Sequence, residues 1–185
     1  MHPDVRLARP DDAAALLDIY NLEVQTSTVT FDILPRTLDE QQQWLTARSG
    51  AHAVIVAERE GEVVGFASLS PWRPRPAYAT SVEDSVYVRR DQQGRGVGRL
   101  LLAELVDVAR AHGFHAVFAR IVGGHESSVR LHQSVGFDVV GTEREVGRKF
   151  GRWLDVVVME LLLSAPRRAE HAPAIVHEAS GPADA

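Results

Sequence analysis

The chain has 185 residues, of which 45% are hydrophobic and 24% charged, an ordinary composition for one globular domain. It contains no cysteine, which excludes disulfides, cysteine-ligated metals and a cysteine nucleophile. The net charge of −5 argues against a bulk electrostatic attraction to nucleic acid. No apolar run approaches the roughly 20 residues of a membrane span. The composition therefore predicts a cytoplasmic protein without nucleic-acid or membrane partners.

In the first half of the chain, the spacing of apolar residues changes from the helical period to the alternation of strands. Thr37 and Glu40 form a capping-box pattern at the start of a helix. A Glu60-Gly61 turn joins two stretches rich in β-branched residues, which predicts a hairpin. The expected elements are a strand at 4–8, helices at 13–24 and 37–47, and strands at 52–59 and 62–69.

The second half alternates strands with helices and ends in two strands. The expected elements are strands at 79–88 and 116–122, helices at 97–112 and 127–134, and strands at 137–146 and 153–163. This order predicts an α+β domain (α/β with a mixed sheet) over residues 1–163. Residues 164–185 are rich in alanine and proline and poor in core-forming residues, which predicts a disordered C-terminal tail.

A glycine-rich turn, Gln93-Gly94-Arg95-Gly96-Val97-Gly98, separates the strand at 79–88 from the helix at 97–112. Free N–H groups at a helix N-terminus bind anions, and glycines let a phosphate approach the backbone. Arg95 and Arg99 add positive charge there. The dinucleotide fingerprint and the P-loop pattern do not fit. The glycines alone leave a plain turn as an equal alternative.

The residues around this turn resemble the GCN5-related N-acetyltransferase (GNAT) superfamily. The turn matches its Gln/Arg-x-x-Gly-x-Gly/Ala signature, Ser85-Val86-Tyr87-Val88 resembles its preceding strand, and residues 128–137 resemble its last motif. The resemblance implies a mostly antiparallel central sheet flanked by helices, with acetyl-CoA as co-substrate and no metal. It implies coenzyme contacts from Val86, Tyr87, Val88, Gln93, Gly94, Arg95, Gly96, Val97, Gly98, Arg99, His125, Ser128 and Ser134. His125 departs from the asparagine that family members often have.

Segments outside the coenzyme motifs resemble the phosphinothricin and methionine sulfone/sulfoximine acetyltransferase branch. They are Thr28-Val29-Thr30-Phe31-Asp32, residues 77–83 and residues 147–156. The resemblance implies acetyl transfer to the α-amine of a small amino-acid-like substrate, and a homodimer. A GNAT enzyme acting on another amine (antibiotic, polyamine or protein N-terminus) and a non-catalytic acyl-CoA-binding module remain alternatives.

Two titratable residues are candidate catalytic groups. Acetyl transfer needs a neutral amine, and the lack of cysteine leaves direct attack in a ternary complex as the simple scheme. In the resembling branch, a glutamate at the place of Glu83 acts as the base; a solvent-facing glutamate is the alternative. His132 stands where many family members have a tyrosine that acts as the general acid, so His132 is the candidate acid here. The alternative is a histidine that only makes a structural hydrogen bond in its helix. The resemblance also implies oxyanion stabilisation by N–H groups of Val86–Val88 near a strand bulge.

The loop Trp72-Arg73-Pro74-Arg75-Pro76-Ala77-Tyr78 is a candidate acceptor site. Its prolines limit its freedom, and arginines suit carboxylate or phosphinate oxygens. We expect Arg73, Arg75 and Tyr78 to bind substrate, with Phe31 as a pocket wall; a solvated loop is the alternative. The histidines have no zinc spacing.

Overall fold

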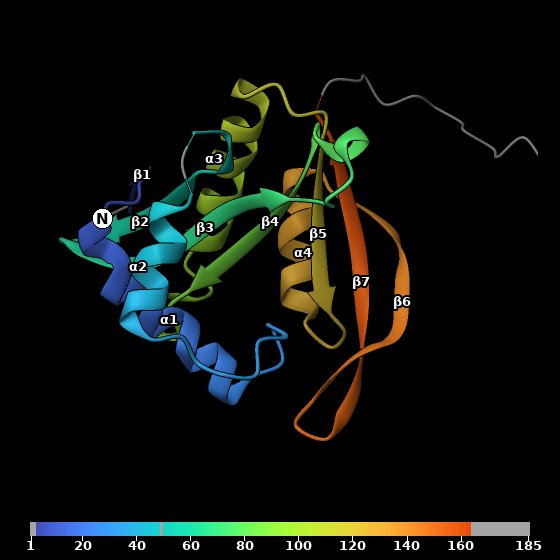
Figure 1. Ribbon diagram of the computed structural model, residues 1–185, viewed down its shortest axis with the longest axis horizontal. Coiled ribbons are helices and arrows are strands. Elements are labelled where there is room, and N and C mark those ends of the chain that lie inside the picture. The colour runs from blue at the N-terminus through green and yellow to red at the C-terminus, as the bar shows by residue number, and fades with distance from the viewer. Residues whose placement is uncertain (1–2, 49, 164–185) are drawn as a thin grey trace, which may run out of the picture.

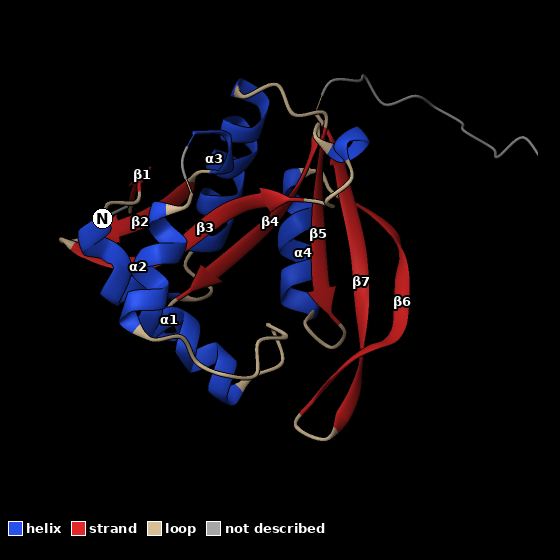
Figure 2. Ribbon diagram, viewed as in Figure 1, coloured by secondary structure: helices blue, strands red, loops and turns tan. Residues whose placement is uncertain are grey.

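A computed structural model describes residues 3–48 and 50–163, which form a seven-stranded sheet with helices on both faces (Figures 1 and 2). The predicted tail at 164–185 lies outside the described residues. The strand order is β1-β2-β3-β4-β5-β7-β6. The strands are β1 Asp4–Leu7, β2 Val54–Arg59, β3 Glu62–Pro71, β4 Ser81–Val88, β5 Ala116–Val122, β6 Asp138–Lys149 and β7 Arg152–Leu162. The helices are α1 Ala13–Thr26, α2 Leu38–Thr46, α3 Val97–Ala111 and α4 Glu126–Val135.

These elements confirm the expected order and the α+β class. The capping box of α2 forms as predicted, with the Thr37 hydroxyl accepting from the Glu40 N–H and the Glu40 carboxylate accepting from the Thr37 N–H. None of the helices in the described part of the chain is long and apolar enough to span a membrane.

The alternation of side chains along β2 and β3 divides the core into two layers. Val54, Val56 and Phe66 pack against α1 and α2 on one face. Ile55 and Ala67 pack against α3 on the opposite face. Because successive strand residues point to opposite faces, a strand buried on both sides must be apolar on both, as β2 is from Val54 to Ala57. Neighbouring site residues on β4 therefore point to opposite faces of the sheet.

The centre of the sheet is forked between β4 and β5. These two strands run parallel and pair only from Ser81 to Glu83, opposite Ala116–Phe118. All other pairings are antiparallel. Beyond Glu83, β4 continues beside β3 while β5 continues beside β7, so the two strands separate (Figure 1).

The predicted bulge near Val86–Val88 is absent. The β3–β4 register is regular from Gly65↔Val88 to Pro71↔Val82, whereas irregular pairing occurs in β2 and β6. The prediction was wrong because the separation of β4 from β5 already frees one edge of β4. A regular strand at a fork exposes backbone groups without an inserted residue.

Candidate active site

The fork contains a cavity of about 890 Å³. Its walls come from α1 and the segment after it, both strands of the fork, the glycine turn and α4. Residues far apart in the sequence thus share one concave surface, the usual form of a small-molecule site.

The glycine turn forms one end of this cavity. Gly94 and Gly96 line it with φ values of 73° and 83°, which explains the need for glycine at both positions. Gly96 is the N-cap of α3 and supplies no side-chain acceptor to the first turn. The first N–H groups of α3 remain available, and Arg99 lines the cavity beside them. This arrangement suits a phosphate group.

The free edge of β4 forms the adjoining wall. Val86, Tyr87 and Val88 line the cavity, and on the β5 side their backbone groups lack a strand partner. Gln93 donates a hydrogen bond to the Val88 carbonyl at 3.2 Å, which ties the turn to the end of this strand. An extended amide-containing chain can pair with such an edge while its phosphates reach the turn. The cavity and its donors therefore fit acetyl-CoA.

Most of the predicted coenzyme residues line the cavity, but three do not. Val97 is buried in the core with 1% exposure, Arg95 is exposed on the turn, and the exposed Ser134 donates its hydroxyl proton to the Leu131 carbonyl. The lining residues are Val86, Tyr87, Val88, Gln93, Gly94, Gly96, Gly98, Arg99, His125 and Ser128. His125 Nε2 also lies 2.9 Å from Thr28 Oγ1, so it links α4 to the segment after α1.

Glu83 lies at the point where the strands separate. It is half-buried, lines the cavity and has no hydrogen-bond partner in the described part of the chain. Burial raises the pKa of Glu83, and the positive charge of Arg120 opposes that increase. A carboxylate with a raised pKa and free oxygens is chemically suited to accept a proton from an amine.

Asp84, the next residue, forms a buried ion pair with His132. His132 Nε2 lies 3.0 Å from Asp84 Oδ2, and its Nδ1 lies 2.7 Å from the Ser128 carbonyl. A carboxylate and a carbonyl only accept, so both contacts are satisfied by the protonated ring. Burial lowers the pKa of His132, but the charge and hydrogen bond of Asp84 and the Ser128 carbonyl raise it above its ordinary value. Asp84 Oδ1 is buried without a partner among the described residues.

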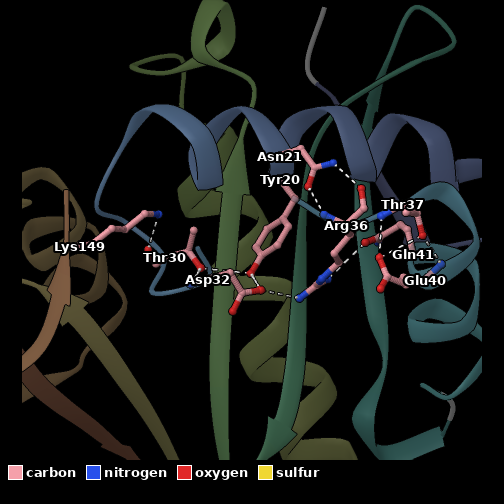
Figure 3. A network of polar contacts seen from close by, with 9 residues as sticks. All are labelled: Tyr20, Asn21, Thr30, Asp32, Arg36, Thr37, Glu40, Gln41 and Lys149. Carbon is pink, nitrogen blue, oxygen red and sulfur yellow. Dashed lines mark hydrogen bonds and ion pairs between the residues drawn. The ribbon is translucent and has the colours of Figure 1, made fainter. Parts of the chain in front are cut away.

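The segment after α1 closes the cavity and is fastened to the distant β6–β7 hairpin. Lys149, 4% exposed, donates to the Thr30 carbonyl at 2.8 Å, as Figure 3 shows. The Tyr20 hydroxyl bonds Asp32 and Thr30 in the same view. Phe31 lines the cavity and packs on Gly147, where an added Cβ would lie only 2.4 Å from the Phe31 ring. The long reach of these contacts fixes the segment over the site.

The sequence reasoning missed four of these side chains: Arg120, Asp84, Tyr20 and Lys149. Arg120 pairs with Glu143 across the sheet and lines the cavity. Lys149 lies in the segment 147–156 that carries the family resemblance, but the sequence gives no sign of its contact with Thr30. The other three belong to no local motif, and only their placement in three dimensions indicates a role. Among the described residues, no group of three or more His, Asp or Glu could hold a metal ion.

The predicted acceptor loop lies outside the cavity lining. Arg73 stacks on Trp72, and Trp72 stacks on Phe118 with ring centroids 4.2 Å apart. Arg75 precedes a short 3-10 turn, and Tyr78 is 39% exposed. Arg73 nevertheless contributes a charge that lowers the pKa of Glu83.

The fold and site define a transferase that uses an acyl-coenzyme donor, and comparison with known proteins specifies it. The family model for an acetyltransferase (GNAT) domain matches residues 5–158. An L-methionine sulfoximine/L-methionine sulfone acetyltransferase from Pseudomonas aeruginosa is 40% identical over 171 residues, covering 91% of this chain and 99% of that protein.

Solved structures agree. A GNAT superfamily phosphinothricin acetyltransferase from Sinorhizobium meliloti, in complex with acetyl-CoA, has a TM-score of 0.85 and 34% identity, covering 95% of this chain and 98% of that one. A ribosomal-protein-alanine N-acetyltransferase from Brucella melitensis has a TM-score of 0.85 and 43% identity, covering 86% and 99%. The chain belongs to the GNAT family and is an acetyl-CoA-dependent N-acetyltransferase.

Proposed function

We propose that this enzyme transfers the acetyl group of acetyl-CoA to the α-amine of a small amino acid of the phosphinothricin, methionine sulfoximine or methionine sulfone type. The observation that carries the proposal is Glu83, a carboxylate with free oxygens in the cavity that the glycine turn closes at its other end. The names of the relatives from Pseudomonas and Sinorhizobium support the acceptor class.

Glu83 is the proposed general base. Acetyl-CoA supplies an activated thioester, but an amino-acid ammonium cannot attack it until a proton is lost. Glu83 accepts that proton, directly or through water, because burial raises the pKa of its carboxyl above the ordinary value and so makes the carboxylate a stronger base. The neutral amine then attacks the acetyl carbon and the C–N bond forms. The nitrogen releases its second proton to solvent, and the C–S bond breaks to give the amide and the thiolate. With no cysteine in the chain, this direct transfer in a ternary complex needs no acyl-cysteine step.

His132 is the proposed acid, and backbone groups stabilise the developing negative charge. The N–H groups along Val86–Val88 face the open side of β4 and can donate to the carbonyl oxygen of the acetyl group. His132 lines the same cavity, and its Nε2 proton, which is donated to Asp84 in this structure, can pass to the departing thiolate once that hydrogen bond breaks.

Two positive side chains whose charges act on Glu83 are the proposed contacts for the acceptor's anionic oxygens. Arg120 lines the cavity, and the charge of Arg73 reaches Glu83 from the loop before β4. Arg75 and Tyr78 belong to the same loop and remain proposed substrate residues, as does Phe31 in the opposite wall.

A homodimer in the cytoplasm is the proposed working form. The β6–β7 hairpin exposes large apolar side chains, with Phe150 57% and Trp153 60% exposed, beside Val139 and Val146 at 51% and 48%. An apolar surface of this kind is typical of a protein interface. Sedimentation velocity tests it: a monomer that persists at high concentration contradicts the dimer.

The test of the proposed function is release of coenzyme A thiol from acetyl-CoA in separate reactions with different acceptors. The panel contains phosphinothricin, methionine sulfoximine, methionine sulfone, a polyamine and a peptide with N-terminal alanine. We expect the first three to be preferred. Preference for the peptide would favour the activity named for the Brucella relative, and thiol release equal to background with every acceptor would favour a binding module.

A further inference from the structure

A second, smaller cavity of about 70 Å³ lies on the face of the sheet covered by α1 and α2. It shares Tyr20, Ser85 and Tyr87 with the large cavity, so the two spaces adjoin at these residues. None of the reaction steps proposed above uses the other residues of the small cavity.

Two guanidinium groups meet in this small cavity. Arg36 and Arg48 both stack on Trp44, at 5.3 Å and 4.3 Å from its ring centroid, and all three line the space. Burial and the charge of Arg36 lower the pKa of Arg48. Holding two like charges together costs free energy, which a negative charge between them would offset.

The small cavity is lined by several polar groups that have no hydrogen-bond partner among the described residues. The Arg48 guanidinium makes no hydrogen bond in the described part of the chain, and its Nε is buried. Ser68, Ser70 and Ser85 also line the space, and their hydroxyls are likewise without partners among the described residues.

The carboxylate that pairs with Arg36 is already engaged. Arg36 donates to Asp32 at 3.3 Å and to Gln41 at 3.2 Å, and Asp32 also accepts from the Tyr20 hydroxyl (Figure 3). Asp32 does not line the small cavity. Unpaired donors in this partly enclosed space need an acceptor from a ligand or from water.

We propose that the small cavity is a subsite for one oxyanion group, a carboxylate or phosphinate, of the acceptor amino acid. The volume suits one such group rather than a whole amino acid, since a single water molecule occupies roughly 30 Å³ of liquid. The group must therefore remain attached to the rest of the acceptor, which lies in the adjoining large cavity. An acceptor of the phosphinothricin type has two anionic groups, and the second can lie toward Arg120. This inference rests on the proposed function.

Arg48→Gln is the sharpest test because it removes an unpaired guanidinium without breaking a hydrogen bond. We expect the variant to raise KM for the amino-acid acceptor about tenfold to a hundredfold while KM for acetyl-CoA stays unchanged. Arg110→Gln is the matched control, because Arg110 is exposed near the end of α3 and bonds only Asp107. An unchanged acceptor KM in Arg48→Gln, with an unchanged melting temperature, overturns the proposal.

A second measurement does not depend on turnover. Inorganic phosphate is titrated against the wild type and both variants with coenzyme A at saturation, so that the glycine turn is occupied. We expect phosphate to raise the melting temperature of the wild type and Arg110→Gln but not of Arg48→Gln, and to compete with the acceptor. Equal effects on all three proteins overturn the subsite even if no acceptor is found, and non-competitive phosphate overturns its assignment to the acceptor.

Discussion

The two ends of the large cavity are assembled in different ways. At the coenzyme end, the glycine turn is held locally: Gln93 bonds the Val88 carbonyl 5 residues away. At the acceptor end, Lys149 reaches Thr30 across 119 residues. The first end is a local motif on a strand–turn–helix unit, whereas the second exists only after the β6–β7 hairpin has docked. Substitutions at the two ends should therefore separate the kinetic constants of the two substrates.

The largest expected effect is at Glu83, where the two ends meet. Glu83→Gln should lower kcat by about 10²–10⁴-fold, because the amide cannot accept the proton of the ammonium group. In the wild type, activity should fall as the pH drops through the raised pKa of this carboxyl, and that acidic limb should disappear in the variant. Initial rates between pH 5 and 9 measure both.

The control for this variant is Glu104→Gln, which removes one exposed carboxylate from α3. It should retain the kcat and the pH profile of the wild type. Full turnover in Glu83→Gln would remove Glu83 from the mechanism and leave deprotonation of the amine to the solvent.

The next largest effect is on stability and concerns Asp84. This residue follows Glu83 on β4, and its side chain points to α4, where it pairs with His132. Asp84→Asn removes the charged partner of a buried imidazolium and should lower the free energy of unfolding by about 3 kcal/mol. The pKa of His132 is raised in the folded protein, so the pair stabilises fully below the unfolded pKa of about 6.5. That stabilisation is lost as the pH rises through the raised value. The difference between variant and wild type should therefore be largest near pH 6 and smaller at higher pH.

Urea unfolding at several pH values measures this difference. Asp138→Asn, at the exposed start of β6, makes the same change in charge and should leave stability within about 0.5 kcal/mol of the wild type. A loss of stability independent of pH would mean that Asp84 supports His132 by packing alone.

His132→Phe with full kcat would show that the thiolate obtains its proton elsewhere.

A smaller effect separates the two arginines of the glycine turn. Arg99 lines the cavity and Arg95 does not, although the sequence treats both alike. Arg99→Gln should raise KM for acetyl-CoA about tenfold, with weaker dependence on salt, because one cation near the phosphates is lost. Arg95→Gln should change it less than about twofold. Equal effects would mean that the coenzyme extends over the outside of the turn.

The same contrast explains what the sequence could predict. The order of strands and helices, the glycine turn and the position of Glu83 are readable because periodicity and local motifs encode them. The Asp84–His132 pair, the docking of Phe31 on Gly147 and the position of Arg120 depend on register and on the fork, which no local pattern specifies. The prediction of a bulge was wrong for the same reason. The edge of β4 is free because β5 separates from it after Glu83, and not because of an inserted residue in β4 itself.

The smallest effect tests whether the docked hairpin shapes the acceptor end. In Gly147→Ala the new methyl group would lie 2.4 Å from the Phe31 ring, so the half-exposed ring must move. We expect KM for the acceptor to rise about threefold, equivalent to roughly 0.7 kcal/mol, with KM for acetyl-CoA unchanged. Gly141→Ala is the control on the same strand, because an added methyl group there meets nothing within 4 Å. If Gly147→Ala lowers the melting temperature but leaves the acceptor KM unchanged, then Phe31 fastens the segment after α1 without forming the pocket wall, and the long-range contacts serve stability rather than selectivity.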